Sequence, residues 1–123
     1  MTDQEFRALA EQWMQAYLNS IDASREYGAL SAELDFTPMP RVVEHLEEAT
    51  DAQQQRELLQ IRSKAAWARS KALAAKAAEL DVQIRAILPC NVWYRVNGKG
   101  IMHTFGVATQ IMDWEEVLEK VAQ

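Results

Sequence analysis

The side chains best suited to covalent chemistry are one cysteine and one histidine near the C-terminal end. Cys90 and His103 form the candidate thiol–imidazole pair, in which a base would withdraw the proton from a sulfur nucleophile. Cys90 precedes the strand pattern that leads to His103, and no acid is evident to orient the imidazole. We therefore interpret the two as ordinary residues at a helix–strand junction, and we predict no catalytic residue.

Metal and phosphate chemistry are also disfavoured by spacing. His45 is a single imidazole beside Glu44 and Glu47, whereas a metal site needs several converging ligands. Residues 97–100 (Asn-Gly-Lys-Gly) are rich in glycine but lack the spacing of a phosphate-binding loop and the helix that follows one. We predict no metal and no cofactor.

The first element that must position these residues is a helix over about residues 3–34. Thr2 and Glu5 have the spacing of a capping box, in which the hydroxyl accepts from the amide three residues later. Pro38 and Pro40 end the pattern, so residues 35–39 are the predicted connection to the next helix. Apolar or small residues recur three or four apart, which is one helical stripe, at Phe6, Leu9, Trp13, Ala16, Ser20, Ala23, Tyr27, Leu30 and Leu34.

A long helix is predicted over about residues 40–88, where Pro40 is suited to the first turn. Thr50 followed by Asp51 could cap a new start, so a helix split near residue 50 is an alternative. Because the connection is short, the two helices should be antiparallel neighbours. A heptad frame runs through Val42, His45, Ala49, Ala52, Arg56, Leu59, Ser63, Ala66, Ser70, Leu73, Ala77, Leu80, Ile84 and Ile87.

After Pro89 the period of the pattern changes from helical to alternating. Residues 91–107 contain two β-type runs around Asn97-Gly98, which is a strong hairpin signal. Asp113 and Glu116 repeat the capping-box spacing before a short amphipathic helix over about 113–122. The predicted fold is mainly α (α+β): one domain over 1–123, with a long antiparallel helical hairpin or coiled coil, then a β-hairpin and a short helix.

Charge is unevenly distributed along the chain. The net charge is −5, yet residues 1–61 carry −8 and residues 62–105 carry +6. A basic segment with aromatic neighbours can bind a protein or stack nucleic-acid bases. The candidate binding residues are Arg62, Lys64, Trp67, Arg69, Lys71, Lys76, Trp93, Tyr94 and Arg95. We expect part of this segment to face solvent.

These features favour a small non-enzymatic interaction protein of the adaptor or inhibitor type, similar in design to accessory proteins that phages encode. It would bind a protein partner through its helical surface or hairpin, and a homodimer is expected because the long helix exceeds its intramolecular partner. The alternative is a nucleic-acid-associated protein that uses the basic segment 62–99. An enzyme ranks third. A polar start, a single cysteine and no long apolar run predict a cytoplasmic protein that does not enter membranes.

Overall fold

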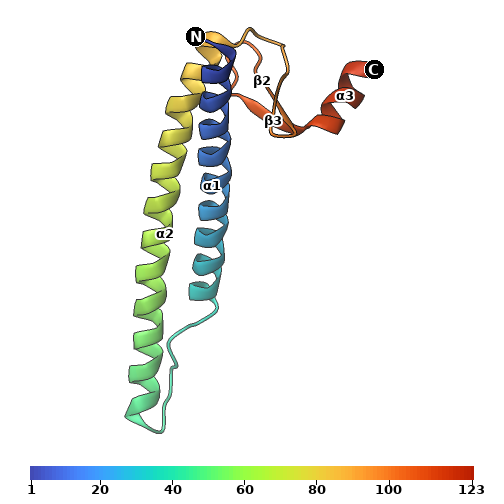
Figure 1. Ribbon diagram of the computed structural model, residues 1–123. Helices are drawn as coiled ribbons and strands as arrows, with labels where there is room; N and C mark the ends of the chain where they lie inside the picture. The colour runs from blue at the N-terminus through green and yellow to red at the C-terminus, as the bar shows by residue number, and fades with distance from the viewer. The chain divides into compact units, whose positions relative to one another are not determined.

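The computed structural model describes all 123 residues and confirms the predicted class, mainly α with a small antiparallel sheet (Figure 1). No helix is both long enough and apolar enough to cross a membrane. The elements in chain order are α1 (Asp3–Asp35), α2 (Leu46–Ile87), β1 (Tyr94–Val96), β2 (Lys99–Met102), β3 (Gln110–Asp113) and α3 (Trp114–Ala122).

The chain divides into two compact units, and both long helices contribute to each. Unit 1 comprises Met1–Leu18 and Ala74–Gln123, and unit 2 comprises Asn19–Leu73. Unit 1 therefore contains the start of α1, the end of α2, the sheet and α3. Unit 2 contains the rest of the two helices and the segment that connects them.

The stripe predicted on α1 is confirmed along its whole length. Every member is buried or half-buried, from Phe6 to Leu34, and Ala23 is fully buried. The N-terminal cap is also confirmed, because the amide of Glu5 donates a hydrogen bond to the Thr2 hydroxyl at 3.1 Å. The acidic residues of the first turn, Asp3 and Glu5, further suit the positive end of the helix dipole.

The heptad frame predicted for α2 is confirmed from Ala49 to Ile84, where each position is at least half-buried. Its two ends were predicted incorrectly. The helix begins at Leu46 rather than near residue 40, so Val42 and His45 precede it, and Leu88 rather than Ile87 is buried at the far end. The helix is not split near residue 50.

The connection between the helices covers residues 36–45, twice the predicted length. Residues that precede proline avoid the helical region, so Pro38 and Pro40 keep this segment extended instead of starting a helix. The side chain of Thr50 donates to the carbonyl of Leu46 at 3.2 Å, a bond within a continuing helix rather than a new cap.

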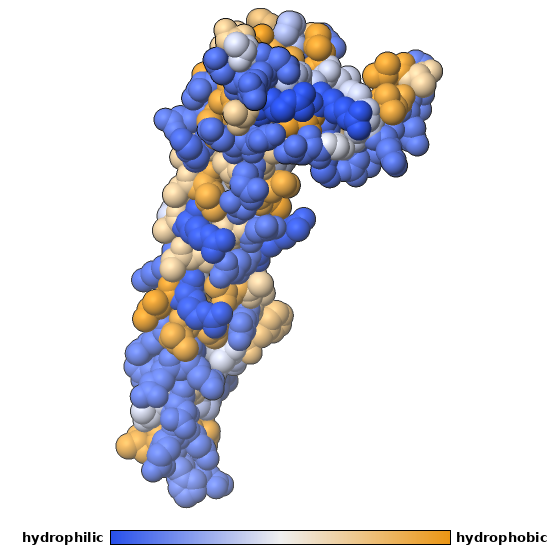
Figure 2. All heavy atoms as spheres, in the orientation of Figure 1, coloured by the Kyte–Doolittle hydropathy of each residue, from blue (hydrophilic) through white to orange (hydrophobic).

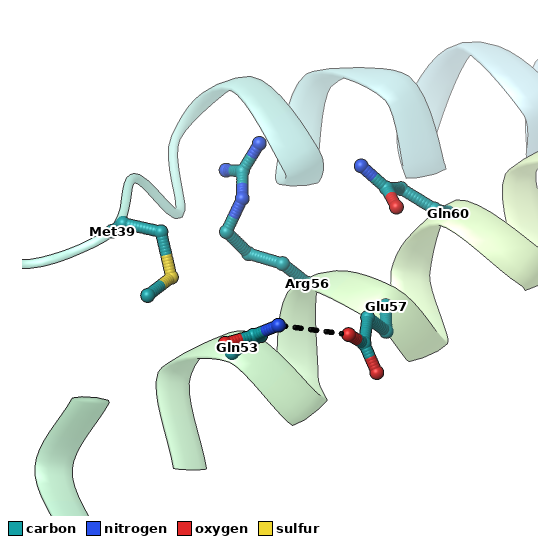
Figure 3. Close-up of a pocket in the computed structure, with 5 residues that line it drawn as sticks. All are labelled: Met39, Gln53, Arg56, Glu57 and Gln60. Carbon is teal, nitrogen blue, oxygen red and sulfur yellow. Dashed lines mark hydrogen bonds between the residues drawn. The ribbon is translucent and has the colours of Figure 1, made fainter. Parts of the chain in front are cut away.

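Arg56 is a charged residue in the heptad frame of α2, within unit 2, and its hydrogen bonds explain its position there. Its Nη1 donates to the carbonyl oxygens of Leu34 and Thr37, at 3.2 and 2.5 Å. Figure 3 shows the Arg56 side chain directed from α2 toward the end of α1. The last carbonyls of a helix have no partner within the helix, and α1 has no basic residue in its last turn. Arg56 adds a donor from α2 to the Leu34 carbonyl, which also accepts from the Thr37 amide at 3.3 Å, and a donor to the Thr37 carbonyl beyond the helix.

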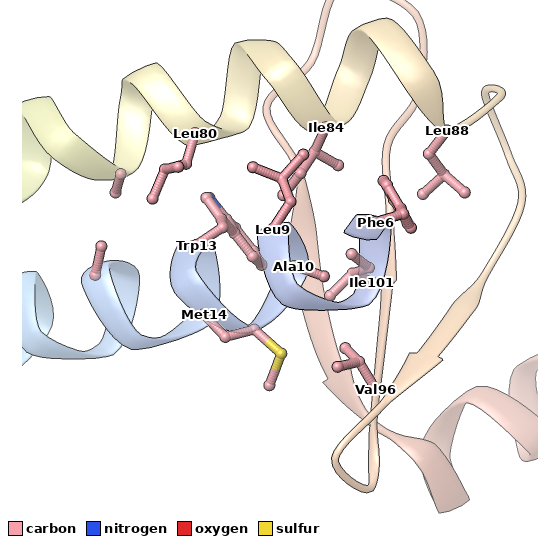
Figure 4. Packing of buried hydrophobic residues seen from close by; sticks show 12 residues of the cluster. Phe6, Leu9, Ala10, Trp13, Met14, Leu80, Ile84, Leu88, Val96 and Ile101 are labelled. Carbon is pink, nitrogen blue, oxygen red and sulfur yellow. The ribbon is translucent and has the colours of Figure 1, made fainter. Parts of the chain in front are cut away.

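The main hydrophobic core lies in unit 1 (Figure 4). Trp13 of α1 and Ile84 of α2 are almost completely buried there, together with Val96 and Ile101 from the sheet. Successive residues of a strand face opposite sides, so every second residue shares a side. The same side of β1 that presents Val96 therefore presents Tyr94, whose ring meets the edge of Phe6 at a centroid distance of 4.7 Å.

The sheet has the order β1-β2-β3, with both pairs antiparallel. Val96 pairs with Lys99, so Asn97 and Gly98 form the two-residue turn that was predicted. Their φ angles of +49° and +74° are the signature of a type I′ turn. Strand β3 was not predicted. It pairs Met102 with Gln110 and Lys99 with Asp113.

Replacing Gly98 with valine should destabilise unit 1 by about 1 kcal/mol or more, because a β-branched residue resists positive φ. A Cβ at this position would meet no other atom within 4 Å, so the effect would be purely conformational. Gly98→Asn is the matched control, since asparagine tolerates this conformation. Equal midpoints of urea denaturation for the two variants would contradict the turn assignment.

Helix α3 covers the second side of the sheet. Val117 and Trp114 lie against Gly100 of β2, together with Trp93, which precedes β1. Asp113 is the N-cap residue but its carboxylate contacts Lys99 and makes no capping bond, so the capping box predicted there is wrong. The first amide of α3 is satisfied instead by the Gly98 carbonyl, at 3.0 Å.

Candidate functional site

The candidate binding residues fall into both units. Arg62, Lys64, Trp67, Arg69 and Lys71 belong to unit 2, whereas Lys76 and residues 93–95 belong to unit 1. The candidate residues are therefore described unit by unit.

Residues 93–95 contribute to the packing of unit 1. The hydroxyl of Tyr94 donates to Asp3 at 2.8 Å, and Arg7 lies over the Tyr94 ring. Burial and this hydrogen bond raise the pKa of Tyr94 above its usual value. On the other side of β1, the guanidinium of Arg95 lies 5.4 Å from the centre of the Trp114 ring. Each of these side chains therefore has a partner within the fold.

The candidate basic residues of unit 2 are exposed, as expected: Arg62, Lys64, Arg69 and Lys71. Arg69 makes a long ion pair with Glu26, 3.5 Å between nitrogen and oxygen, in which both side chains are at least half exposed. Such pairs contribute about 0–1 kcal/mol, so these charges add little to stability. The positive charge along this part of α2 is accessible to a partner.

Trp67 is unusual for a large aromatic residue, because 49% of it is exposed. The ammonium of Lys71 lies 5.2 Å from the centre of its ring, one helical turn away. Trp67 also lines a surface hollow of about 250 Å³ together with Tyr27, Ser63 and Lys64. A basic rim around an aromatic surface is a common feature of binding faces.

In unit 2, serine hydroxyls of α1 and α2 pair across the two helices. The hydroxyls of Ser24 and Ser70 lie 2.7 Å apart, and those of Ser31 and Ser63 lie 3.4 Å apart. The numbering rises on one helix as it falls on the other, as the antiparallel prediction requires. The serines that interrupted the heptad frame are thus explained by pairing across the two helices.

A second heptad frame on α2 faces solvent and was missed in the sequence. Leu58 and Ile61 are 58% and 66% exposed, and the alanines that continue their spacing are exposed too. On the face drawn in Figure 2, hydrophobic residues lie among hydrophilic ones along the helices. We define the outer face of α2 as Leu58, Ile61, Ala65, Ala68 and Ala72.

Basic residues flank this outer face on both edges. Arg62 and Arg69 each follow an apolar position by one residue, and Lys64 and Lys71 each precede one. In coiled coils these flanking positions carry the charges that choose the partner. The signal that would have revealed the outer face is this spacing of three and four, offset from the buried frame by alternately one and two residues.

Possible sites for covalent or metal chemistry are few. No group of three or more histidine, cysteine, aspartate or glutamate side chains is arranged to hold a metal ion. The structure does bring Cys90 and His103 together, with Sγ 3.9 Å from Nδ1. Comparison with protein-family models, with curated proteins and with solved structures gives no match.

Proposed function

We propose that this protein is a non-enzymatic binding protein whose outer face of α2 docks an amphipathic helix of a protein partner with acidic flanks. The observation that carries the proposal is the exposed heptad frame between two basic edges. An apolar helix face left in water is unusual, because helices of globular proteins bury such a stripe against a neighbour. Helix-on-helix docking is a recurrent mode of recognition.

The residue sizes on the outer face suit a helix as the occupant. Ala65, Ala68 and Ala72 leave room for a close approach of two backbones, while Leu58 and Ile61 supply the larger apolar area. The basic flanks favour acidic residues on the partner and oppose a second copy of the same helix, since like charges would meet. Homodimerisation therefore requires another surface, and it remains a prediction, as does a cytoplasmic location.

Nucleic-acid binding through the basic segment is the second candidate, and Trp67 beside Lys71 favours it. Two features weigh against it. The centre of the surface is aliphatic rather than basic, and the net charge of −5 opposes approach to a polyanion. Salt separates the two candidates. Each phosphate contact releases counterions from the nucleic acid, so nucleic-acid binding falls steeply as ionic strength rises.

The test uses two synthetic helical peptides that differ only in charge. Both carry leucine at the heptad core positions, and one has glutamate and the other lysine at the flanks. Fluorescence anisotropy with the intact protein should show binding of the glutamate peptide and at least about tenfold weaker binding of the lysine peptide. Equal binding of both, or of neither, would contradict the proposal.

Two variants locate the binding on the protein. Arg62→Glu with Arg69→Glu should weaken binding of the glutamate peptide by about tenfold and strengthen that of the lysine peptide. Ile61→Gln should weaken both, while its thermal stability stays within about 0.5 kcal/mol because the side chain is exposed. A DNA duplex of 20 base pairs is the third probe. If it binds more tightly than the glutamate peptide at 0.15 M salt, the nucleic-acid candidate replaces ours.

A further inference from the structure

The Cys90 thiol and the His103 imidazole are neighbours in unit 1. Their Sγ and Nδ1 atoms lie 3.9 Å apart. The other ring nitrogen, Nε2, lies 2.5 Å from the carbonyl oxygen of Leu88. A carbonyl oxygen can only accept, so Nε2 carries a proton and donates it. In the neutral ring Nδ1 is then unprotonated, and its lone pair faces the thiol.

The fold holds this pair through the backbone as well. The amide of Asn91, next to Cys90, donates to the carbonyl oxygen of His103 at 2.8 Å. Asn91 itself has a φ of +63°, a conformation that few residues other than glycine adopt. His103 is only 4% exposed, whereas Cys90 is exposed. A buried base therefore faces an accessible nucleophile.

No charged side chain makes a hydrogen bond or an ion pair with either residue. Along α2, Asp81 accepts from the Arg85 side chain at 3.0 Å and from the amide of Thr109 at 2.9 Å, so both of these charges have other partners. The Leu88 carbonyl takes the orienting role that an acid has in many thiol–imidazole pairs. The sequence could not predict this partner of His103, because every residue has a backbone carbonyl and the residue type does not show which one accepts the hydrogen bond.

We propose that Cys90 and His103 form a site of thiol–disulfide exchange for small-molecule disulfides. Nδ1 of His103 accepts the proton of the Cys90 thiol as Sγ attacks one sulfur of the disulfide. The Sγ–S bond forms, the original S–S bond breaks, and the departing thiolate takes the proton from the imidazolium. The products are a mixed disulfide on Cys90 and one free thiol, so the small-molecule disulfide is itself the oxidant of Cys90 and no other redox reagent is needed.

The first experiment measures how fast iodoacetamide alkylates the thiol at pH 7. Cys90 is the only cysteine, so the reagent reports on this site alone. The reference is Cys90→Ser with Ala78→Cys, which places a single exposed thiol on α2 away from any histidine. Cys90 should react about tenfold faster than this reference, because general-base assistance is large where the base is oriented. Equal or slower reaction would overturn the proposal.

The second experiment separates proton removal from accessibility. His103→Gln removes the base but retains an amide that can donate to the Leu88 carbonyl. Its alkylation should be about tenfold slower than that of the native protein at pH 7. At pH 10.5, where thiols are ionised without help, the two rates should converge. A difference that persists at pH 10.5 would mean that His103 acts only on packing, and the proposal would be abandoned.

The third experiment tests the disulfide itself. Intact protein incubated with oxidised glutathione should gain one mixed disulfide, visible as a single mass increase that dithiothreitol reverses. The rate should exceed that of the Ala78→Cys reference by the same factor as alkylation does. If alkylation is fast and the glutathione adduct forms no faster than on the reference, the thiol is activated but this class of substrate is wrong.

Discussion

Replacing Trp13 with alanine should lower the free energy of unfolding by about 3–5 kcal/mol. The Trp13 side chain is only 2% exposed and stacks on Tyr17, with ring centroids 5.3 Å apart. Its loss leaves a cavity between the end of α2 and the start of α1 in the core of unit 1 (Figure 4). Urea denaturation followed by circular dichroism measures the change.

Trp67→Ala is the matched control, because it makes the same chemical change at an exposed position. It should cost less than about 1 kcal/mol, mainly the contact with Lys71. The same variant should weaken binding of the acidic peptide if the aromatic ring extends the docking surface. Comparable losses of stability for the two tryptophans would contradict the assignment of one to the core and the other to a partner.

Replacing Gly100 with alanine should destabilise unit 1 by about 1–3 kcal/mol. A Cβ there would lie 2.7 Å from Cγ2 of Val117, and 3.1 and 3.2 Å from the rings of Trp93 and Trp114. The contact with Val117 is too short for real atoms and the two ring contacts are tight, so the side chains that α3 places against β2 would have to shift. Tryptophan fluorescence should shift to longer wavelength as the two rings meet water, and protease cleavage within α3 should accelerate.

Gly28→Ala is the opposite case. Gly28 lies inside α1 with no atom within 4 Å of a Cβ, so alanine adds no clash and restricts the unfolded chain. We expect a gain of about 0.5–1 kcal/mol. The two glycine-to-alanine changes should thus have opposite signs. A stable Gly100→Ala variant with unaltered fluorescence would show that α3 is not packed on the sheet.

The sequence was most informative where a repeat was long. Nine positions on α1 and most of the frame on α2 were predicted because a buried stripe must recur every three or four residues. The turn at Asn97-Gly98 was predicted because few pairs of residues adopt two positive φ angles. In each case one physical requirement, burial or positive φ, restricts the residue types at several positions, so the pattern can be recognised in the sequence.

Other features depended on contacts that a sequence does not display. Strand β3 is four residues long and gains its order from pairing with β2, so its own pattern is weak. Arg56 is a charged residue in an otherwise mostly apolar or small frame, and its role depends on carbonyl groups that the sequence does not place. The outer face of α2 consists largely of alanine, which is common in any helix, so it becomes evident only once the buried frame is assigned.

The hydrogen bond between Asp3 and Tyr94 joins residues that are 91 apart in the chain. During synthesis at about 5–20 residues per second, the amino-terminal segment waits roughly 5–20 s for the residues that complete its unit. Unit 2 is continuous in sequence and is finished first. The apolar side chains of Phe6, Leu9 and Trp13 are therefore exposed on the ribosome until the rest of unit 1 is made. Chaperones can bind them during that interval.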